Sequence, residues 1–228
     1  KIRLQSHLPP DDVKRGLSKF AEAVKAMSDG GLEISLFAGG QIVPVKDQLD
    51  SVGKGTLDMA MYPEGFWYKT IPVSEVGMGI PFAFRDLEEA KYFMYRKGYL
   101  DLLRKAYAKH NVYVIPYEAY PIGLMTKKPI NRAEDLKGMK LRAYGTMAEW
   151  LGKLGASTVV IPGGELYTAL ATGVVSGAHW GDAGPMFIMK FHEVLKYYMK
   201  PEPAIGGWNS LLINMDLWKK FTEQQKKI

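Results

Sequence analysis

The apolar side chains of this chain follow a helical period and an extended period in alternation, and this alternation is what most constrains its fold. Residues 13–27 carry apolar side chains at intervals of three and four, as a helix on a core does. Residues 32–36 alternate apolar with polar side chains, as a half-buried strand does. The same succession continues along the chain. It indicates an α/β fold with a largely parallel sheet.

The remaining elements are expected from the same two periods. Further strands are expected at 57–62, 112–117, 122–126, 139–143, 159–161 and 211–214. Further helices are expected at 44–52, 86–109, 146–154 and 164–172. The third of these begins with a T-x-x-E capping box formed by Thr146 and Glu149, and Gly155 ends it.

Part of the first half of the chain is echoed in the second half at a constant distance. Each of Pro162, Gly173, Ala178 and Trp180 lies 118 positions after its counterpart, which is Pro44, Gly55, Ala60 or Tyr62. Two related halves would explain the echo, and chance similarity between two strand–helix–strand units is the alternative. In related halves, Tyr62 and Trp180 would end equivalent strands, where open α/β sheets bind their ligands.

Composition excludes several classes of protein. The chain has 228 residues, no cysteine and a formal charge of +6. Disulfides, thiolate nucleophiles and cysteine-bound zinc are therefore excluded. The sequence contains no run of eighteen apolar residues, so it predicts no transmembrane helix. The basic residues are scattered and form no stripe with interleaved aromatic residues, so we expect no nucleic-acid partner.

Enzyme signatures are missing as well. The sequence has no G-x-S-x-G, Walker, G-x-G-x-x-G or H-E-x-x-H motif. Its four histidines are His7, His110, His179 and His192, and none lies at metal-ligand spacing from another.

Arg142 is the strongest candidate for a binding residue. It ends an expected strand, and a helix begins four residues later, so a helix N-terminus would lie beside its guanidinium. Arginine presents a planar fork of donors that matches a carboxylate. The alternative is a surface arginine or a partner for Glu134 or Asp135.

Aromatic residues cluster at three further places. Trp180 follows a strand and has small neighbours, and Trp67 lies in an aromatic loop at 62–68. Trp208 and Asn209 follow two glycines that would allow a hinge between lobes. Walls of a ligand cleft are one interpretation; a core tryptophan and a satellite cluster under a loop are the alternatives.

Several motifs resemble those of the solute-binding proteins of TRAP (tripartite ATP-independent periplasmic) transporters. They are L-K-G-M-K-L-R at 136–142, G-E-L-Y-T-A-L-A-T-G-V-V-S-G at 164–177, V-G-K-G-T-L-D-M at 52–59 and I-N-M-D-L-W-K-K-F-T-E-Q-Q-K at 213–226. The resemblance runs over nearly the whole chain. It implies a two-lobed α/β periplasmic binding protein of type II-like fold, with its ligand cleft between the lobes and no enzymatic activity.

The resemblance also implies boundaries and partners. Lobe I would comprise residues 1–118 and 210–228, and lobe II residues 119–209, with crossover strands near 119–126 and 206–214. The family continues beyond this length, so we expect a C-terminally truncated chain. The implied partners are a small organic acid anion and the permease subunits of the transporter. Arg142 occupies the position that binds the ligand carboxylate in the family.

Within that family, the local sequence of this chain is most similar to the subgroup that binds 2-oxo and 2-hydroxy acids. That subgroup holds a metal ion with a glutamate and a glutamine, and this chain has His179 and Pro121 at those positions. Both changes remove oxygen ligands that a hard cation prefers. We therefore expect no metal-bridged ligand and no cofactor. Tyr120 and Trp208 indicate a pocket for an aromatic or branched acid.

The sequence thus predicts a periplasmic protein that binds a monocarboxylate and delivers it to a TRAP permease. The expected ligand-binding residues are Arg142, Trp180, His179, Trp208, Asn209, Tyr62, Trp67 and Tyr120. One alternative is a lyase or transferase that uses Asp182 or His179 as a general acid or base. A ligand-sensing module of a membrane receptor is the other alternative.

Overall fold

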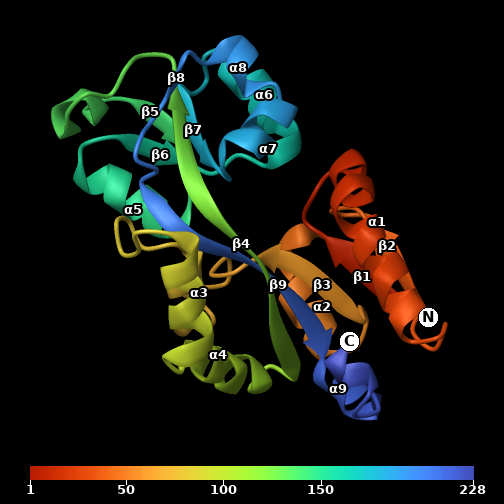
Figure 1. The fold of residues 1–228 in the computed structure, drawn as a ribbon. Coiled ribbons are helices and arrows are strands. Elements are labelled where there is room, and N and C mark those ends of the chain that lie inside the picture. The colour runs from red at the N-terminus through yellow and green to blue at the C-terminus, as the bar shows by residue number, and fades with distance from the viewer. The chain divides into compact units, whose positions relative to one another are not determined.

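The computed structural model describes residues 1–228, and its contacts divide the chain into two compact units (Figure 1). Unit 1 comprises residues 1–62, 100–117 and 209–228, and unit 2 comprises residues 63–99 and 118–208. The chain passes between the units within β3 (Met59–Pro63), at the start of α4 (Tyr99–Ala108), and within β4 (Val112–Thr126) and β9 (Ala204–Asn214).

The predicted lobes and these units differ over residues 63–99, which belong to unit 2 here, and at the two boundary residues 118 and 209. A compact unit is defined by contacts within one conformation, whereas a lobe is defined by the residues that move together. The lobe boundaries therefore stay a prediction.

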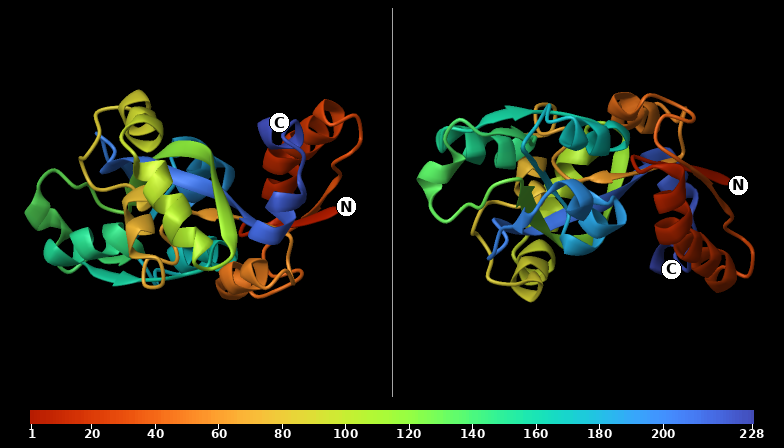
Figure 2. Two further views of the ribbon diagram at one scale, coloured as in Figure 1. Left: turned by 90° about the horizontal axis from the view of Figure 1, so that it is seen from below. Right: turned by 90° about the horizontal axis from the view of Figure 1, so that it is seen from above.

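Unit 1 is built on a sheet with the strand order β2-β1-β3-β9-β4. β1 (Ile2–Ser6) lies parallel to β2 (Ile34–Phe37) and to β3. α1 (Pro10–Met27) packs along β2, as the three views in Figures 1 and 2 show. The apolar face of α1 and the inward side chains of the strands form one core, with members that include Leu4, Leu17, Met61 and Ile213.

Short helices complete unit 1. A 3₁₀ turn, η1 (Val45–Asp47), leads into α2 (Gln48–Gly53), so the helix predicted after Pro44 is present. α4 (Tyr99–Ala108) precedes β4, and α9 (Met215–Lys220) follows β9. The side chain of Asn214 caps α9 by accepting hydrogen bonds from the backbone of Asp216 and Leu217 at 3.1 and 3.0 Å. The chain closes with η4 (Gln225–Lys227).

Unit 2 is built on a second set of strands with the order β4-β7-β5-β6. β5 (Lys140–Arg142) lies parallel to β6 (Ser157–Val159) and to β7 (Gly177–Trp180), whereas β4 is antiparallel to β7 and to β8 (Tyr197–Tyr198). The sheet is therefore more mixed than the alternating pattern predicts, because β4 enters from the opposite direction.

The helices of unit 2 pack in two apolar clusters. α5 (Gly145–Lys153) joins the cluster that includes Leu141, Met147 and Leu151. α6 (Gly163–Ala171), α7 (Ala183–Ile188) and α8 (Phe191–Val194) form the cluster around Leu166, Leu170 and Phe191. The remaining helical segments are η2 (Pro72–Met78), α3 (Leu87–Arg96) and η3 (Ala133–Leu136).

Three local predictions were wrong. The helix expected at 86–109 is divided into α3 and α4, and Gly98, with a φ of +80°, lies between them. The strands expected at 112–117 and 122–126 are one strand, β4. Thr146 does not cap α5, because the N-cap residue is Tyr144 and no side chain caps the helix.

The register of the strands supports two related halves. Gln5 of β1 lies opposite Ala60 of β3, and Arg142 of β5 lies opposite Ala178 of β7. The Gln5 Nε2 donates to the carbonyl of Val43 at 2.8 Å, and the Arg142 Nε donates to the carbonyl of Ile161 at 3.1 Å. Ala178 and Ile161 each lie 118 positions after their counterparts. Gln5 and Arg142 therefore occupy equivalent places, and each side chain holds the loop before the next helix.

Candidate functional site

Arg142 is a buried cation held flat by two backbone carbonyls. It is the last residue of β5 and only 5% exposed. Its Nε donates to the Ile161 carbonyl at 3.1 Å, and its Nη1 donates to the His179 carbonyl at 2.9 Å. Because these carbonyls follow β6 and belong to β7, neighbouring segments on both sides of β5 fix the guanidinium plane.

Two aromatic rings lie against this guanidinium. Its Cζ is 4.7 Å from the ring centroid of Tyr144 and 4.6 Å from that of Trp180. Both separations suit a cation–π interaction, which compensates part of the cost of burying the charge. Sequence reasoning missed Tyr144. Its position two residues after Arg142, on the same side of an extended segment, was the available signal.

His179 lies on the adjacent strand and is 2% exposed. Its ring centroid is 4.8 Å from that of Tyr144, and its Nδ1 is buried without a hydrogen-bond partner. Burial, and then the positive charge of Arg142, hold the pKa of His179 well below its usual value of 6.5. The imidazole is therefore neutral at pH 7, and Arg142 keeps the positive charge.

The nearby phenols are neutral too. Burial raises the pKa of Tyr144, although the Arg142 charge and a hydrogen bond to Arg142 oppose the increase. Burial raises the pKa of Tyr120 well above its usual value, and the charge of Arg142 partly opposes this as well. The pKa of Tyr120 thus responds to both Arg142 and Tyr144, which places this phenol in the electrostatic surroundings of the guanidinium.

Trp67 is connected to the guanidinium through a second layer of rings. The centroid of Phe66 lies 5.4 Å from that of Trp67 and 6.4 Å from that of Tyr144, edge to face in both cases. Trp67 itself is buried. Sequence analysis singled out the loop but did not select Phe66, whose contact with Tyr144 depends on residues distant in sequence.

The other expected residues lie in different surroundings. Trp208 is buried against the ring of Tyr95, at a centroid distance of 5.8 Å. Tyr62 belongs to unit 1, where its ring lies 4.9 Å from that of His7. Asn209 also belongs to unit 1 and is half-buried on β9. The described contacts of unit 2 thus gather Arg142, Trp180 and His179 into one cluster.

Asp182 has a structural task. Its side chain caps α7 by accepting a hydrogen bond from the backbone of Gly184 at 2.9 Å. No three side chains of histidine, cysteine, aspartate or glutamate lie together as metal ligands would. One buried cation between two aromatic rings suits holding an anion.

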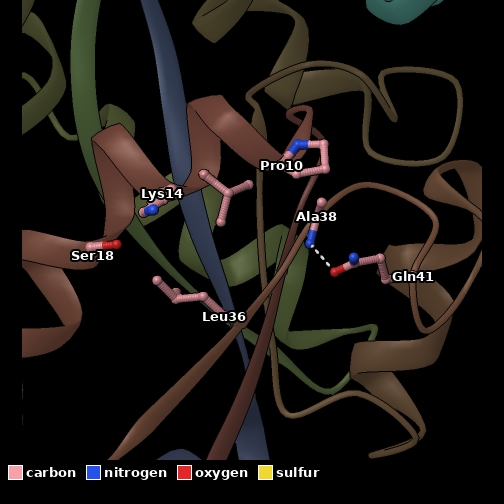
Figure 3. A pocket seen from close by; sticks show the side chains of 7 residues that line it. Pro10, Lys14, Ser18, Leu36, Ala38 and Gln41 are labelled. Carbon is pink, nitrogen blue, oxygen red and sulfur yellow. Dashed lines mark hydrogen bonds between the residues drawn. The ribbon is translucent and has the colours of Figure 1, made fainter.

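A shallow groove of about 270 Å³ lies elsewhere, in unit 1, between α1 and the segment after β2 (Figure 3). It is lined by Pro10, Val13, Lys14, Ser18, Leu36, Ala38 and Gln41. The Oε1 of Gln41 accepts a hydrogen bond from the backbone amide of Ala38 at 2.7 Å, as the dashed line shows. Its one cation, Lys14, is exposed, so the groove lacks the buried charge that makes Arg142 a stronger anion site.

These features are typical of bacterial solute-binding proteins. The family model described as "Bacterial extracellular solute-binding protein, family 7" matches residues 6–228, so the chain belongs to that family. The resemblance to TRAP solute-binding proteins and the α/β fold of that class are confirmed. Members of this family are binding proteins of transporters rather than enzymes, as the sequence predicts.

Named relatives bind small acids. A monocarboxylate 2-oxoacid-binding periplasmic protein of Nostoc sp. is 28% identical over 93% of this chain and 59% of its own length. A TRAP periplasmic solute-binding protein of Colwellia psychrerythraea, with bound calcium and pyruvate, is 27% identical, with a TM-score of 0.88 over 99% of this chain and 70% of that one. A Desulfovibrio salexigens protein with bound orotic acid is 28% identical, with a TM-score of 0.84 over 99% and 73%.

The chain therefore spans about 59% of the length of the Nostoc relative. The relatives are named as periplasmic proteins. Within the described residues, every helix is too short or too polar to cross a bilayer.

Proposed function

We propose that this protein captures a small organic monocarboxylate in the periplasm and delivers it to the membrane permease of a TRAP transporter. The observation that carries the proposal is the buried guanidinium of Arg142, fixed by two carbonyls and flanked by Tyr144 and Trp180. A ligand carboxylate that reaches this group forms a charge-assisted pair in a medium of low effective dielectric.

The proposed ligand carries one negative charge. His179 is neutral beside Arg142, and Tyr144 and Trp180 supply ring surface rather than charge. One fixed positive charge balances one carboxylate, whereas a second carboxylate would be buried at a high cost. The Nostoc relative is named for binding monocarboxylate 2-oxoacids, and the Colwellia protein holds pyruvate, which supports the same class here.

The ring-bearing residues are proposed as walls for the rest of the acid. Trp180 lies directly on Arg142, and Trp67 is connected to it through Phe66 and Tyr144. Tyr120, Trp208, Asn209 and Tyr62 stay in the proposed set with the roles expected from the sequence. Aromatic surface of this kind suits aromatic or branched side groups, and orotic acid in the Desulfovibrio protein is a ring acid.

A cation bridge is not proposed. The Colwellia protein holds calcium, which prefers six to eight oxygen ligands. Here His179 brings a buried imidazole in place of a carboxylate, and no three acidic or histidine side chains lie together. The donor set does not fit a hard cation, so Arg142 alone is assigned to the carboxylate.

Differential scanning fluorimetry with matched pairs of acids and amides tests the proposal. The panel contains pyruvate, lactate, 3-methyl-2-oxobutanoate, benzoylformate and the primary amide of each. A bound acid at 100 times its dissociation constant adds about 2.7 kcal/mol to the free energy of unfolding. We expect at least one acid to raise the melting temperature and its amide to leave it unchanged. Equal effects of acid and amide, or none from any acid, would contradict the proposal.

Delivery to the permease needs a separate measurement. Uptake of the bound acid into proteoliposomes that contain the cognate permease should depend on this protein. Uptake that is equally fast without it would refute the transport role and leave the binding role intact.

A further inference from the structure

Two buried polar atoms have no hydrogen-bond partner, one on a residue that contacts Arg142 and one on a residue four positions after it in the chain. They are the Nδ1 of His179 and the Oγ1 of Thr146. A buried polar atom normally has a hydrogen-bond partner, and an exception calls for an explanation. A ligand group that supplies the missing hydrogen bonds is such an explanation.

His179 is tied to the guanidinium by the described contacts, and Thr146 by its position along the chain. The carbonyl of His179 accepts from the Arg142 Nη1 at 2.9 Å, and the ring of Tyr144 contacts both Arg142 and His179. Thr146 lies in the first turn of α5, two residues after Tyr144. The N-terminus of this nine-residue helix has no side-chain cap, so the Thr146 hydroxyl does not cap the helix.

The tautomer of His179 follows from its surroundings. The imidazole is neutral, so one nitrogen carries a proton and the other carries a lone pair. Nδ1 is the ring nitrogen closer to its own backbone, where the carbonyl binds Arg142. The positive charge favours the lone pair on that side. Nδ1 is therefore assigned as an acceptor, and it needs a donor from the ligand.

We propose that His179 and Thr146 form a subsite for a hydrogen-bond-donating substituent, a hydroxyl or an N–H, on the carbon next to the ligand carboxylate. The substituent donates to Nδ1 of His179, and where it is a hydroxyl the Thr146 hydroxyl donates to its oxygen. This inference rests on the proposed function of Arg142 and narrows it to 2-hydroxy acids and acids with an adjacent N–H. A 2-oxo acid lacks the donor and should bind more weakly.

Isothermal titration calorimetry with matched acids tests the subsite. The probes are lactate, pyruvate and propanoate, and the larger series mandelate, benzoylformate and phenylacetate. In at least one series we expect the parent protein to bind the 2-hydroxy acid about tenfold more tightly than the other two, the value of one good buried hydrogen bond. A parent protein that binds none of the six, or that binds the three acids of each series equally, would overturn the inference.

Two near-isosteric variants locate the effect. His179→Phe keeps the ring against Tyr144, and Thr146→Val keeps the branched shape. Each should bring the ratio of hydroxy to unsubstituted acid close to one, because the variant lacks the polar atom that distinguishes the two acids. Because each variant removes a buried polar atom without a partner, the unliganded protein should melt at the same temperature or higher. A variant that keeps the tenfold ratio would overturn the role of that residue.

Arg142→Gln separates this inference from the proposed function. If the function is correct, this variant loses every acid that the parent binds. If Arg142→Gln binds the acids as the parent does, the proposed function fails. If it loses them while the parent shows no preference for the hydroxy acid, only the subsite fails.

Discussion

Replacing Arg142 by glutamine should remove ligand binding and leave the fold intact. The amide nitrogen of glutamine lies the same number of bonds from Cα as the Nε of arginine. At the equivalent place in unit 1, Gln5 already makes the corresponding hydrogen bond, to the Val43 carbonyl at 2.8 Å. The introduced glutamine is therefore expected to keep the bond to the Ile161 carbonyl, which Arg142 makes at 3.1 Å, and to lose only the charge.

The expected loss of affinity follows from the burial of the charge. Arg142 is 5% exposed, so a bound carboxylate is withdrawn from water together with it. Breaking a buried pair by removing one partner costs about 3–5 kcal/mol. This corresponds to a dissociation constant raised by roughly two to three and a half powers of ten.

The unliganded protein should respond differently. The glutamine variant loses the hydrogen bond to the His179 carbonyl and two cation–π contacts, but it also loses the cost of burying a cation. These changes oppose each other, and the free energy of unfolding should stay within about 2 kcal/mol of the parent. Arg142→Ala also loses the Ile161 bond and leaves a cavity, so it should be about 2 kcal/mol less stable than Arg142→Gln.

Calorimetry with an acid that the parent binds, and urea denaturation of the three unliganded proteins, measure both quantities. Unchanged affinity in Arg142→Gln would refute the role of the guanidinium. Equal stability of the glutamine and alanine variants would refute the structural equivalence of Gln5 and Arg142.

Three further predictions concern stability. The pKa of His179 is lowered in the folded protein, so between pH 7.5 and 5.5 the unfolded chain takes up a proton that the folded protein does not. In urea denaturation, the free energy of unfolding of the parent should therefore fall by up to about 1.4 kcal/mol per pH unit relative to that of His179→Phe. If the two proteins show the same dependence of this free energy on pH, the buried imidazole is not neutral. Burial raises the pKa of Asp58, but hydrogen bonds from Arg3, followed by the charge of Arg3, lower it overall. Asp58→Asn should therefore lower the free energy of unfolding by about 1 kcal/mol at pH 7, and by nothing measurable once the pH falls below the pKa of Asp58 in the folded protein. A loss of stability that persists in acid would argue against the ion pair. A Cβ on Gly177 would lie 2.5 Å from the Met125 carbonyl, whereas one on Gly152 of α5 meets nothing within 4 Å. Thermal melts should show Gly177→Ala destabilised by about 1–3 kcal/mol and Gly152→Ala unchanged or slightly stabilised. Similar melting temperatures for the two variants would refute the steric argument.

Local periodicity was sufficient to predict most elements and the place of Arg142 at the end of a strand. The strand that ends at Arg142 alternates apolar and polar side chains, and Gly155 and Gly173 follow the ends of α5 and α6. Capping was predicted less well. The T-x-x-E pattern at Thr146 is local, whereas Tyr144 takes the N-cap position because its backbone is extended, with φ −151° and ψ 166°.

The surroundings of the site depend on strand order, which the sequence does not state. His179 is buried because β7 lies between β4 and β5, and β4 joins that pair from a distant part of the chain. Phe66 contacts Tyr144 across more than seventy positions. Only the assembled unit shows that His179 is neutral and that its Nδ1 is left without a partner.

The interleaving of the two units has a practical consequence for dissection. Unit 1 draws on three separate stretches of the chain and unit 2 on two, so no single continuous fragment consists of either unit alone. Simple truncation would leave each half without part of its sheet. Isolating unit 2 for study would instead need its two stretches, 63–99 and 118–208, rejoined by a designed linker that replaces residues 100–117.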